Sequence, residues 1–455
     1  MVSTRSRTSA LTEPLQDSDR PPKRARVDDN AEAPQPNEQI AEVAAESKPQ
    51  GEELSEEEDV EDVEEINKAA HGSNLYLDTI NRLALDFDFE KVLCGKYFQG
   101  RGRNSYAYAH SIHDDHHVFI NLETTKVYVL PDGYPVSDPS LEDISYVLAP
   151  SFRPASVAIL STPAHLSKPS YDLASKPYLP GYIGLNNIKR NDYMNVVIHC
   201  LLHVPPLRDY LLLSNFDGKQ PELLKRFATL SKKLWNPRLF KSQVSPHEFL
   251  QEVGRASGGK FRMEVQGDPV EFLGWLLNRL HKDLGGTKKR NSSTIFSAFQ
   301  GEVRMETQQV LESRGQLRRF KCQRLPQYII LHYKRFTKNN FVEEKNPTIV
   351  NFPLRGVDFR DYIDAPASQP STVYDLVANV THESAAGTTR DKLNTVWKVQ
   401  LRAGSGGGEN EKWFQIQDLI VEEIRKEMIF LGETVLQIWE RRPHSNSVGK
   451  PIFST

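Results

Sequence analysis

The sequence predicts an α+β protein in which a small α+β domain precedes a larger one. Apolar residues at helical spacing dominate from about residue 192 to 284, whereas alternating and β-branched runs dominate from about residue 295 onward. Helices that precede strands in this way are typical of an α+β domain. A separate, shorter group of aromatic and β-branched runs, from residue 73 to 160, predicts the small domain.

The composition is that of a soluble protein. The 455 residues are 38% hydrophobic and 26% charged, and they suffice for two or three domains. No run of about 18 apolar residues occurs, so we expect no transmembrane helix, and the amino terminus lacks the apolar stretch of a secretory signal. Three widely spaced cysteines, Cys94, Cys200 and Cys322, predict a reducing compartment without a disulfide framework.

Residues 1–72 are predicted to be a disordered acidic tail. The first 70 residues contain 8 lysines and arginines against 19 aspartates and glutamates, a net of −11, so the rest of the chain carries +8 of the total of −3. Residues 20–26, RPPKRAR, form a compact basic cluster of the nuclear-import type, which predicts a nuclear protein. Residues 52–65 form an acidic block, and such blocks are either simply solvated or serve as interaction tails.

The elements of the small domain and the linker follow in order. Residues 118–122 and 126–130 alternate as strands do, and the second run leads into the turn at 131–133, which predicts a hairpin. Four prolines in residues 162–180 predict a linker over 161–181. The domain boundaries are therefore 73–160 for the small domain and 182–443 for the larger one, followed by a tail over 444–455.

The larger domain begins with helices and ends with strands. Helical patterns cover 192–214, interrupted by Pro205 and Pro206, and then 222–235, 246–255 and 268–284. Strand patterns cover 327–333, 348–352, 396–402, 412–416 and 434–439. The glycine-rich residues 404–408 predict a flexible hairpin tip between the third and fourth of these strands.

One Cys and four His lie within 24 residues, which suggests a metal site. They are Cys94, His110, His113, His116 and His117. Thiolate and imidazole are the usual zinc ligands, but a structural zinc ion normally takes four ligands, often beginning with a C-x-x-C pair. Here Lys91 stands three residues before Cys94. Surface histidines in a loop therefore remain the alternative.

Four segments of this region resemble the ubiquitin-protease-type zinc finger. They are residues 76–81 (YLDTIN), 85–90 (LDFDFE), 94–102 (CGKYFQGRG) and 116–122 (HHVFINL). The resemblance implies that Cys94, His110 and His116 are zinc ligands. The stretch that should carry the first Cys is missing between Glu90 and Cys94, so the implied zinc site is incomplete.

Residues 184–195, GLNNIKRNDYMN, resemble the cysteine box of ubiquitin-specific proteases. The resemblance implies a papain-like fold with a helical thumb, a β-rich palm and fingers. Asn187 matches the oxyanion-hole position, and Asp192 occupies the position of the nucleophilic cysteine. A carboxylate at that position can cap a helix, but it is not the attacking thiolate that this chemistry uses.

The other two catalytic positions also depart from the protease pattern. Residues 266–273 (QGDPVEFL) and 374–382 (YDLVANVTH) match later boxes of the scaffold. The histidine position falls on Asn394, and the third position falls on Gln417, with Asp418 one place further on. We expect Cys200, two helical turns past Asp192, to pack as a small apolar side chain, and His199 and His382 to be structural.

Further motifs resemble one branch, the tri-snRNP-associated, ubiquitin-protease-like splicing factors. They are residues 204–210 (VPPLRDY), 334–341 (KRFTKNNF) and 344–353 (EKNPTIVNFP). Residues 301–320 are shorter than the fingers of the family and lack paired C-x-x-C motifs, so we expect shortened fingers.

The resemblance implies a non-catalytic pre-mRNA splicing factor in the nucleus. Such a protein supports assembly or stability of the spliceosomal U4/U6-U5 tri-snRNP through protein contacts, with indirect association with small nuclear RNA. The alternatives are a non-catalytic adaptor that binds ubiquitin weakly and a deubiquitinating cysteine hydrolase, for which only the fold argues. No module that reads RNA is visible, and no membrane partner is expected.

Overall fold

The structure is a computed structural model, and its described part belongs to one unit, residues 74–455. The described residues are 77, 80, 82, 103, 105–121, 124–166, 168–216, 218, 220–310, 315–338, 343–364, 370–384, 395–404 and 411–443. The predicted tails, the basic cluster at 20–26, Cys94 and Asn394 lie outside these residues, so the predictions made for them remain predictions.

The small domain is built around a three-stranded antiparallel sheet. Its elements are α3 (Tyr106–His113), β1 (Val118–Ile120), β2 (Val127–Val129), β3 (Pro135–Val136), η4 (Pro139–Leu141) and α4 (Glu142–Leu148), and the strand order is β1-β2-β3. Val118 lies opposite Val129, as the predicted hairpin requires. Ser105 caps α3, because its hydroxyl accepts a hydrogen bond from the Tyr108 amide at 3.2 Å. Val127 and Ile144 are buried in the core of this domain.

The segment expected to be a linker contains short elements instead. They are α6 (Pro163–Leu166), β4 (Ser170–Tyr171) and β5 (Pro177–Tyr178), and they follow α5 (Pro154–Ile159). Tyr178 is buried, and its hydroxyl donates to the Asn236 carbonyl at 3.3 Å and accepts from the Leu239 amide at 2.8 Å. Prolines therefore interrupt regular structure here without freeing the chain, because an aromatic anchor holds the segment.

A helical layer opens the larger domain, as the sequence predicts. Its elements are β6 (Gly184–Leu185), α7 (Asp192–Leu202), α8 (Pro205–Leu213), α9 (Glu222–Leu234), β7 (Gln243–Val244), α10 (His247–Ala256), α11 (Pro269–Asp283) and α12 (Thr294–Phe299). Pro205 begins α8, where its missing N–H costs no hydrogen bond. Every residue of α7 is buried, and this is the pattern of a helix surrounded by protein.

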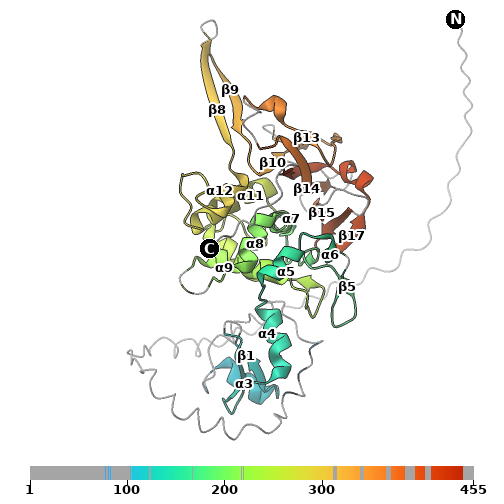
Figure 1. The fold of residues 1–455 in the computed structure, drawn as a ribbon. Coiled ribbons are helices and arrows are strands. Elements are labelled where there is room, and N and C mark those ends of the chain that lie inside the picture. The colour runs from blue at the N-terminus through green and yellow to red at the C-terminus, as the bar shows by residue number, and fades with distance from the viewer. Residues whose placement is uncertain are drawn as a thin grey trace, which may run out of the picture. The chain divides into compact units, whose positions relative to one another are not determined.

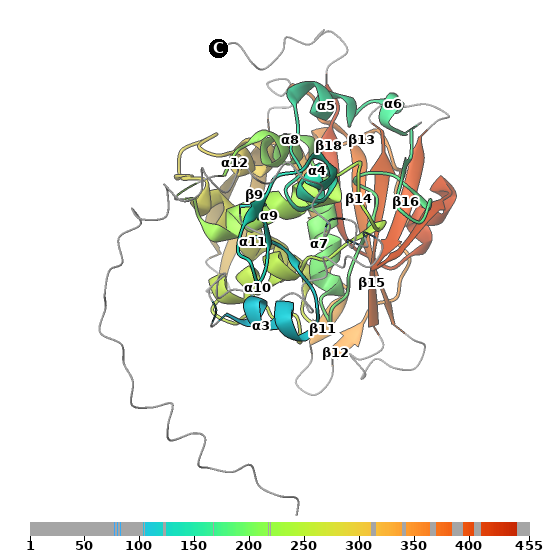
Figure 2. The same ribbon diagram turned by 90° about the horizontal axis from the view of Figure 1, so that it is seen from below.

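A seven-stranded antiparallel sheet packs against these helices. Six strands follow the order β10-β18-β14-β15-β16-β17, and β13 pairs with β14. The elements are β10 (Tyr328–His332), β13 (Val357–Asp358), η5 (Arg360–Tyr362), β14 (Val373–Ser384), β15 (Thr395–Ala403), β16 (Lys412–Gln417), β17 (Ile420–Ile424), η8 (Lys426–Leu431) and β18 (Thr434–Arg441). Helix α7 lies between the other helices and this sheet, in contact with β15 (Figure 2).

The fingers are reduced to one ribbon in the described part of the chain. Strands β8 (Glu302–Val310) and β9 (Gly315–Arg324) form a two-stranded sheet, and Figure 1 shows them extending beyond the larger sheet. At its base, Cys322 of β9 makes an isolated bridge with Ile363. A second small pair is β11 (Phe336–Lys338) with β12 (Glu343–Lys345). The expected shortening of the fingers is thus seen as a two-stranded hairpin.

One predicted strand is wrong. Residues 348–352 contain no strand, although their apolar alternation predicted one. The buried Arg335 guanidinium takes the Asn346 and Thr348 carbonyls as acceptors, at 2.9 and 2.8 Å, and Phe352 is buried. A side chain therefore satisfies the backbone groups that a neighbouring strand would otherwise pair.

No single helix of the described ranges is long and apolar enough to span a membrane. Helices α7 and α8 pass that test only together, as a pair bent by 89°.

Candidate functional site: a carboxylate at the start of α7

Four asparagines organise the loop that leads into α7. The side-chain oxygen of fully buried Asn191 accepts the Ile188 amide at 2.7 Å, and its Nδ2 donates to Asn195 Oδ1 at 3.0 Å and to the Asn186 carbonyl at 3.1 Å. The Asn187 Oδ1 accepts the Asn191 amide at 3.1 Å. The loop is therefore held by side-chain amides, and helix α7 begins at Asp192, where the motif predicts.

Asp192 is 6% exposed and is surrounded by amide groups. Its Oδ2 accepts hydrogen bonds from Gln266 Nε2 at 3.4 Å and from the Trp397 backbone N–H at 3.3 Å, while its Oδ1 has no hydrogen-bond partner among the residues that the structure describes. Burial raises the pKa of Asp192, and the hydrogen bonds from Gln266 and Trp397 oppose this only in part. The helix start thus holds a desolvated carboxylate whose pKa lies above the ordinary value.

A second carboxylate, Asp418, reaches the same place from the turn after β16. Asn187 Nδ2 donates to Asp418 Oδ2 at 3.1 Å, and the Leu185 amide donates to the Asp418 carbonyl at 3.1 Å. Burial raises the pKa of Asp418, and the charge of Asp192 raises it further. A Cβ at Gly184 would lie 2.6 Å from the Leu419 Cα, so only glycine lets this turn approach.

The other two positions assigned from the sequence are Gln417 and Asn394, of which Gln417 has no hydrogen bond to Asp192 among the described contacts. Gln417 ends β16, opposite Ile420 in the ladder with β17. Asn394 lies outside the described residues, so its assignment to the base position is untested. On β14, the strand next to β15, the centroid of the His382 ring lies 4.5 Å from that of the Trp397 ring. Burial lowers the pKa of His382 to about 3. In the part of the chain that the structure describes, amides and not an imidazole hydrogen-bond Asp192.

Comparison with known proteins identifies the scaffold around this site. The family model for ubiquitin carboxyl-terminal hydrolase matches residues 183–444. The chain belongs to the ubiquitin carboxyl-terminal hydrolase family. A second model, for the zinc finger found in ubiquitin hydrolases and other proteins, matches residues 92–141. The predicted order of a zinc-finger domain followed by a ubiquitin-protease fold is confirmed.

The relatives of this hydrolase-family chain point to its splicing branch. It is 41% identical to the probable mRNA-splicing protein ubp10 of Schizosaccharomyces pombe, over 84% of this chain and 93% of that protein. It is 40% identical to human ubiquitin carboxyl-terminal hydrolase 39, over 82% of this chain and 80% of that protein. The crystal structure of an essential yeast splicing factor aligns with a TM-score of 0.65 at 27% identity, covering 81% of this chain and 100% of that one.

No other group of α7 replaces the family's thiol. Cys200 is 1% exposed within the large apolar core, and burial raises the pKa of its thiol far above the usual range. Burial also lowers the pKa of His199 to about 3, so this imidazole stays neutral. Both side chains therefore pack as core residues, as the sequence predicts, since an inaccessible thiol cannot attack a substrate.

The family's zinc finger retains two converging imidazoles. His110 Nε2 lies 2.9 Å from His116 Nδ1, and Asp114 Oδ2 lies 2.5 Å from the other ring nitrogen of His110. Two ligands of one tetrahedral zinc ion lie roughly 3.3 Å apart, and a ligating imidazole usually has a carboxylate on its outer nitrogen. The two histidines therefore fit two of the ligand positions of zinc.

The rest of the zinc ligand set is not found in the described residues. No group of three or more His, Cys, Asp or Glu that could hold a metal occurs among them, and Cys94 lies outside them. His117 has other partners: its Nδ1 bonds to the Leu130 carbonyl oxygen at 2.8 Å and its Nε2 to Asp115 at 2.7 Å. The hydrogen bond to Leu130, and then that to Asp115, raise the pKa of His117.

Two site residues were not singled out from the sequence. Asp418 was noted only as the neighbour of Gln417, because a strand pattern does not reveal that the chain turns at residue 418, where φ is +50°. Gln266 opens the motif at residues 266–273, but its contact with Asp192 joins residues 74 positions apart, which the sequence does not reveal. The usable signal for Asp418 was its place in the Gln-Asp pair that ends β16.

Proposed function

We propose that this chain is a non-catalytic splicing factor of the nucleus. In this role it supports assembly or stability of the U4/U6-U5 tri-snRNP through protein contacts and associates with small nuclear RNA only indirectly. The observation that carries the proposal is the carboxylate of Asp192 at the start of α7, in a chain that is 41% identical to an mRNA-splicing protein along most of its length.

The chemistry of the α7 site supports the absence of catalysis. Amide hydrolysis by this scaffold needs a thiolate, a base and a free oxyanion donor, and these act as a unit. Asp192 supplies no thiolate. The Asn187 Nδ2 donor, which would face an oxyanion, is hydrogen-bonded to Asp418. The site is therefore closed by its own polar groups, and the fold serves as a platform for protein contacts.

Two further assignments complete the proposal. The basic cluster at residues 20–26 directs the chain to the nucleus. Cys94, His110 and His116 are the zinc ligands of the finger domain, three in place of the usual four. Zinc bound to the purified full chain should fall in His116→Ala. Retention of the same zinc content in that variant would contradict the ligand assignment.

The second candidate function is a non-catalytic adaptor that binds ubiquitin. The exposed apolar pair Met305 and Phe320, opposite each other on the finger ribbon, favours a protein-binding role for this hairpin. Titration of the full chain with labelled ubiquitin tests the adaptor. A flat response up to about millimolar concentration excludes useful affinity.

Affinity purification tests the splicing role. Tagged full-length chain should recover tri-snRNP proteins together with U4, U5 and U6 RNA from nuclear extract. A ubiquitin-amide reporter incubated with the same preparation should remain uncleaved. Recovery of no particle component would contradict the splicing role, and reporter turnover that survives Cys200→Ala would contradict the absence of catalysis.

A further inference from the structure

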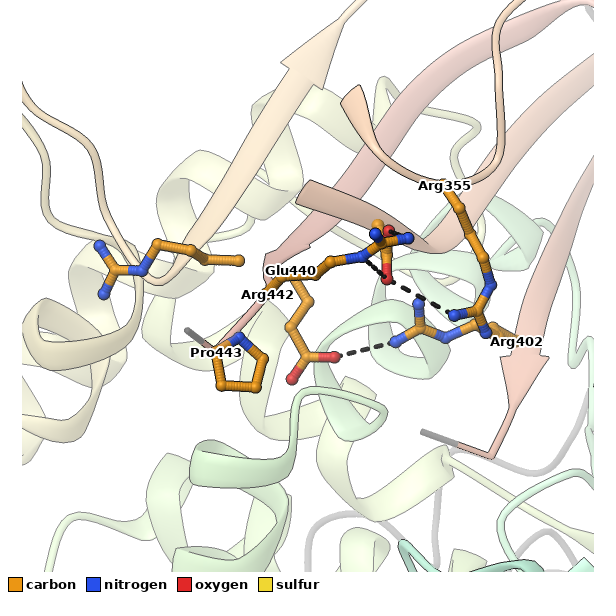
Figure 3. A pocket seen from close by; sticks show the side chains of 7 residues that line it. Arg355, Arg402, Glu440, Arg442 and Pro443 are labelled. Carbon is orange, nitrogen blue, oxygen red and sulfur yellow. Dashed lines mark hydrogen bonds and ion pairs between the residues drawn. The ribbon is translucent and has the colours of Figure 1, made fainter. Parts of the chain in front are cut away.

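A charged pocket lies at the opposite ends of the strands that border Asp192 (Figure 3). Trp397, near the start of β15, contacts Asp192, whereas Arg402, near its end, lines the pocket. The cavity has a volume of about 250 Å³. The residues lining this arginine pocket are Arg355, Asp375, Arg402, Glu440, Arg441, Arg442 and Pro443.

The lining carries more guanidinium groups than carboxylates. Four arginines face two acids, so the lining has a net charge of +2. Arg442 binds Asp375 through two contacts of 2.9 Å. Arg402 Nη2 binds Glu440 Oε2 at 2.8 Å, as Figure 3 shows. Both carboxylates are therefore already paired. Arg355 binds a further carboxylate outside the lining, since its Nη2 lies 2.8 Å from Glu411 Oε2, so the charge left for an anion is that of Arg441.

Arg441 is the member of the arginine pocket without an ion pair to any residue that the structure describes. Its Nη1 donates to the Leu325 carbonyl at 3.4 Å, whereas a guanidinium offers five N–H donors. Next to it, burial and then the charges of Arg290 and Arg441 lower the pKa of Arg324. Like charges gathered in this way repel each other, and a bound anion would relieve the repulsion.

The walls of the arginine pocket are held in place before any ligand arrives. The Gly356 amide donates to Asp375 Oδ1 at 2.9 Å, and the Tyr328 hydroxyl donates to Glu440 Oε1 at 2.6 Å. Asp375 and Arg402 are both buried. Because these side chains are already fixed by their partners, a ligand loses less binding free energy to ordering them. Such preorganisation is usual in recognition sites.

The lining favours a peptide over a nucleic acid. None of the seven lining residues has an aromatic ring, so the pocket offers no platform on which a base could stack. Pro443 supplies an apolar surface, and the paired carboxylates in the walls disfavour a run of phosphates. A single carboxylate carries the one negative charge that the guanidinium of Arg441 can pair, and its aliphatic stem can lie against Pro443.

We propose that the arginine pocket binds an acidic side chain from a glutamate- or aspartate-rich segment of a partner protein. This inference rests on the proposed scaffold function, because it names a surface through which protein contacts are made. In this proposal, a preformed set of guanidinium groups recognises a carboxylate at the strand ends opposite Asp192.

Binding of a fluorescein-labelled Glu-Gly repeat peptide to the full chain tests the proposal by fluorescence anisotropy. Arg441→Gln leaves no carboxylate unpaired, and it should weaken binding roughly tenfold. The matched control is Arg360→Gln, an exposed arginine whose contact with Asp358 is 3.7 Å long, and it should keep the wild-type affinity. Equal affinities in wild type and Arg441→Gln, or equal losses in both variants, would overturn the proposal.

Two more measurements test the electrostatic character of the binding and the chemical class of the ligand. Added salt should weaken peptide binding by the wild-type chain, and binding that is insensitive to salt would overturn the proposal even if Arg441→Gln fails to fold. Single-stranded RNA, or a phosphoserine version of the peptide, that binds more tightly and depends on Arg441 would overturn the choice of a carboxylate ligand.

Recovery of particle proteins separates this inference from the proposed function. Undiminished recovery by Arg441→Gln overturns the arginine pocket as a partner site and leaves the proposed function standing. Absence of recovery by the wild-type chain contradicts the proposed function, while the peptide titration still decides whether the pocket binds acidic side chains.

Discussion

The two ends of β15 border regions of opposite charge. Near Trp397, the carboxylate of Asp192 is buried and that of Asp418 is half-buried, and desolvation raises the pKa of both. Near Arg402, guanidinium groups outnumber carboxylates around an open pocket. In the first region Asp192 is almost fully buried and Asn187 is hydrogen-bonded to Asp418, whereas the second region is an open pocket.

This difference indicates what the fold depends on. Helix α7 is buried on every side, and most of its residues belong to the large apolar core, while Asp192 also accepts a hydrogen bond from the Trp397 amide of β15. The scaffold is therefore held mainly by apolar packing and does not depend on a thiol at residue 192. The fold is therefore kept with a carboxylate at the start of α7, and its surfaces remain for binding. The strand ends opposite Asp192 are then free to serve a partner.

The largest expected effect on stability comes from removing a buried arginine of the arginine pocket. Arg402→Ala removes a buried guanidinium and leaves Glu440 with the Tyr328 hydroxyl as its partner. The free energy of unfolding should fall by about 3 kcal/mol, as for other broken buried ion pairs. Urea denaturation followed by circular dichroism measures this change. Arg360→Ala, at an exposed pair, should change stability by less than about 0.5 kcal/mol, and similar losses in both variants would remove the distinction.

Acid should weaken the Asp192 end through His382. Burial lowers the pKa of His382 to about 3, so the folded state holds it neutral while the unfolded chain takes up a proton near pH 6.5. The contribution of neutral His382 to stability is complete above pH 6.5. It is lost as the pH falls from 6.5 towards the pKa of His382 in the folded state. Between pH 7 and about pH 4.5, the free energy of unfolding should fall by about 2 kcal/mol more in the wild-type chain than in His382→Gln. Parallel pH profiles of the two proteins would contradict this.

The sequence predicts the region around Asp192 better than it predicts the arginine pocket. The helices, the hairpins and Asp192 at the start of α7 follow from local patterns and motif spacing. Asp418 and Gln266 could not be placed, because their contacts with the site depend on the turn after β16 and on packing between distant segments. The arginine pocket joins residues 355 to 443 across three strands, and no local pattern marks it. The strand predicted at 348–352 failed because Arg335 binds its backbone.

A smaller effect is expected from neutralising Asp192. Since burial raises its pKa, the charged carboxylate destabilises the folded chain at neutral pH, and its repulsion with Asp418 adds to this. Asp192→Asn should therefore raise the free energy of unfolding by about 1 kcal/mol at pH 7. The gain should shrink as the pH falls through the raised pKa of the folded state, and it should vanish below the ordinary value of 3.8, where the wild-type carboxyl is protonated in both states. Asp361→Asn, at an exposed site, is the control, and a loss of stability in Asp192→Asn would show that the charge is stabilised.

The smallest expected effect is on catalysis, and it sharpens the comparison most. Asp192→Cys returns a thiol to the start of α7, where the helix terminus favours the thiolate. Hydrolysis of a ubiquitin-amide reporter should nevertheless stay at the background rate, because Asn187 remains bound to Asp418 and amide groups, not an imidazole, face residue 192. An iodoacetamide-labelling assay first confirms that the new thiol is accessible. Turnover above background in an accessible, folded Asp192→Cys variant would mean that the substitution at Asp192 alone silences the site, and that its surroundings remain competent for proteolysis.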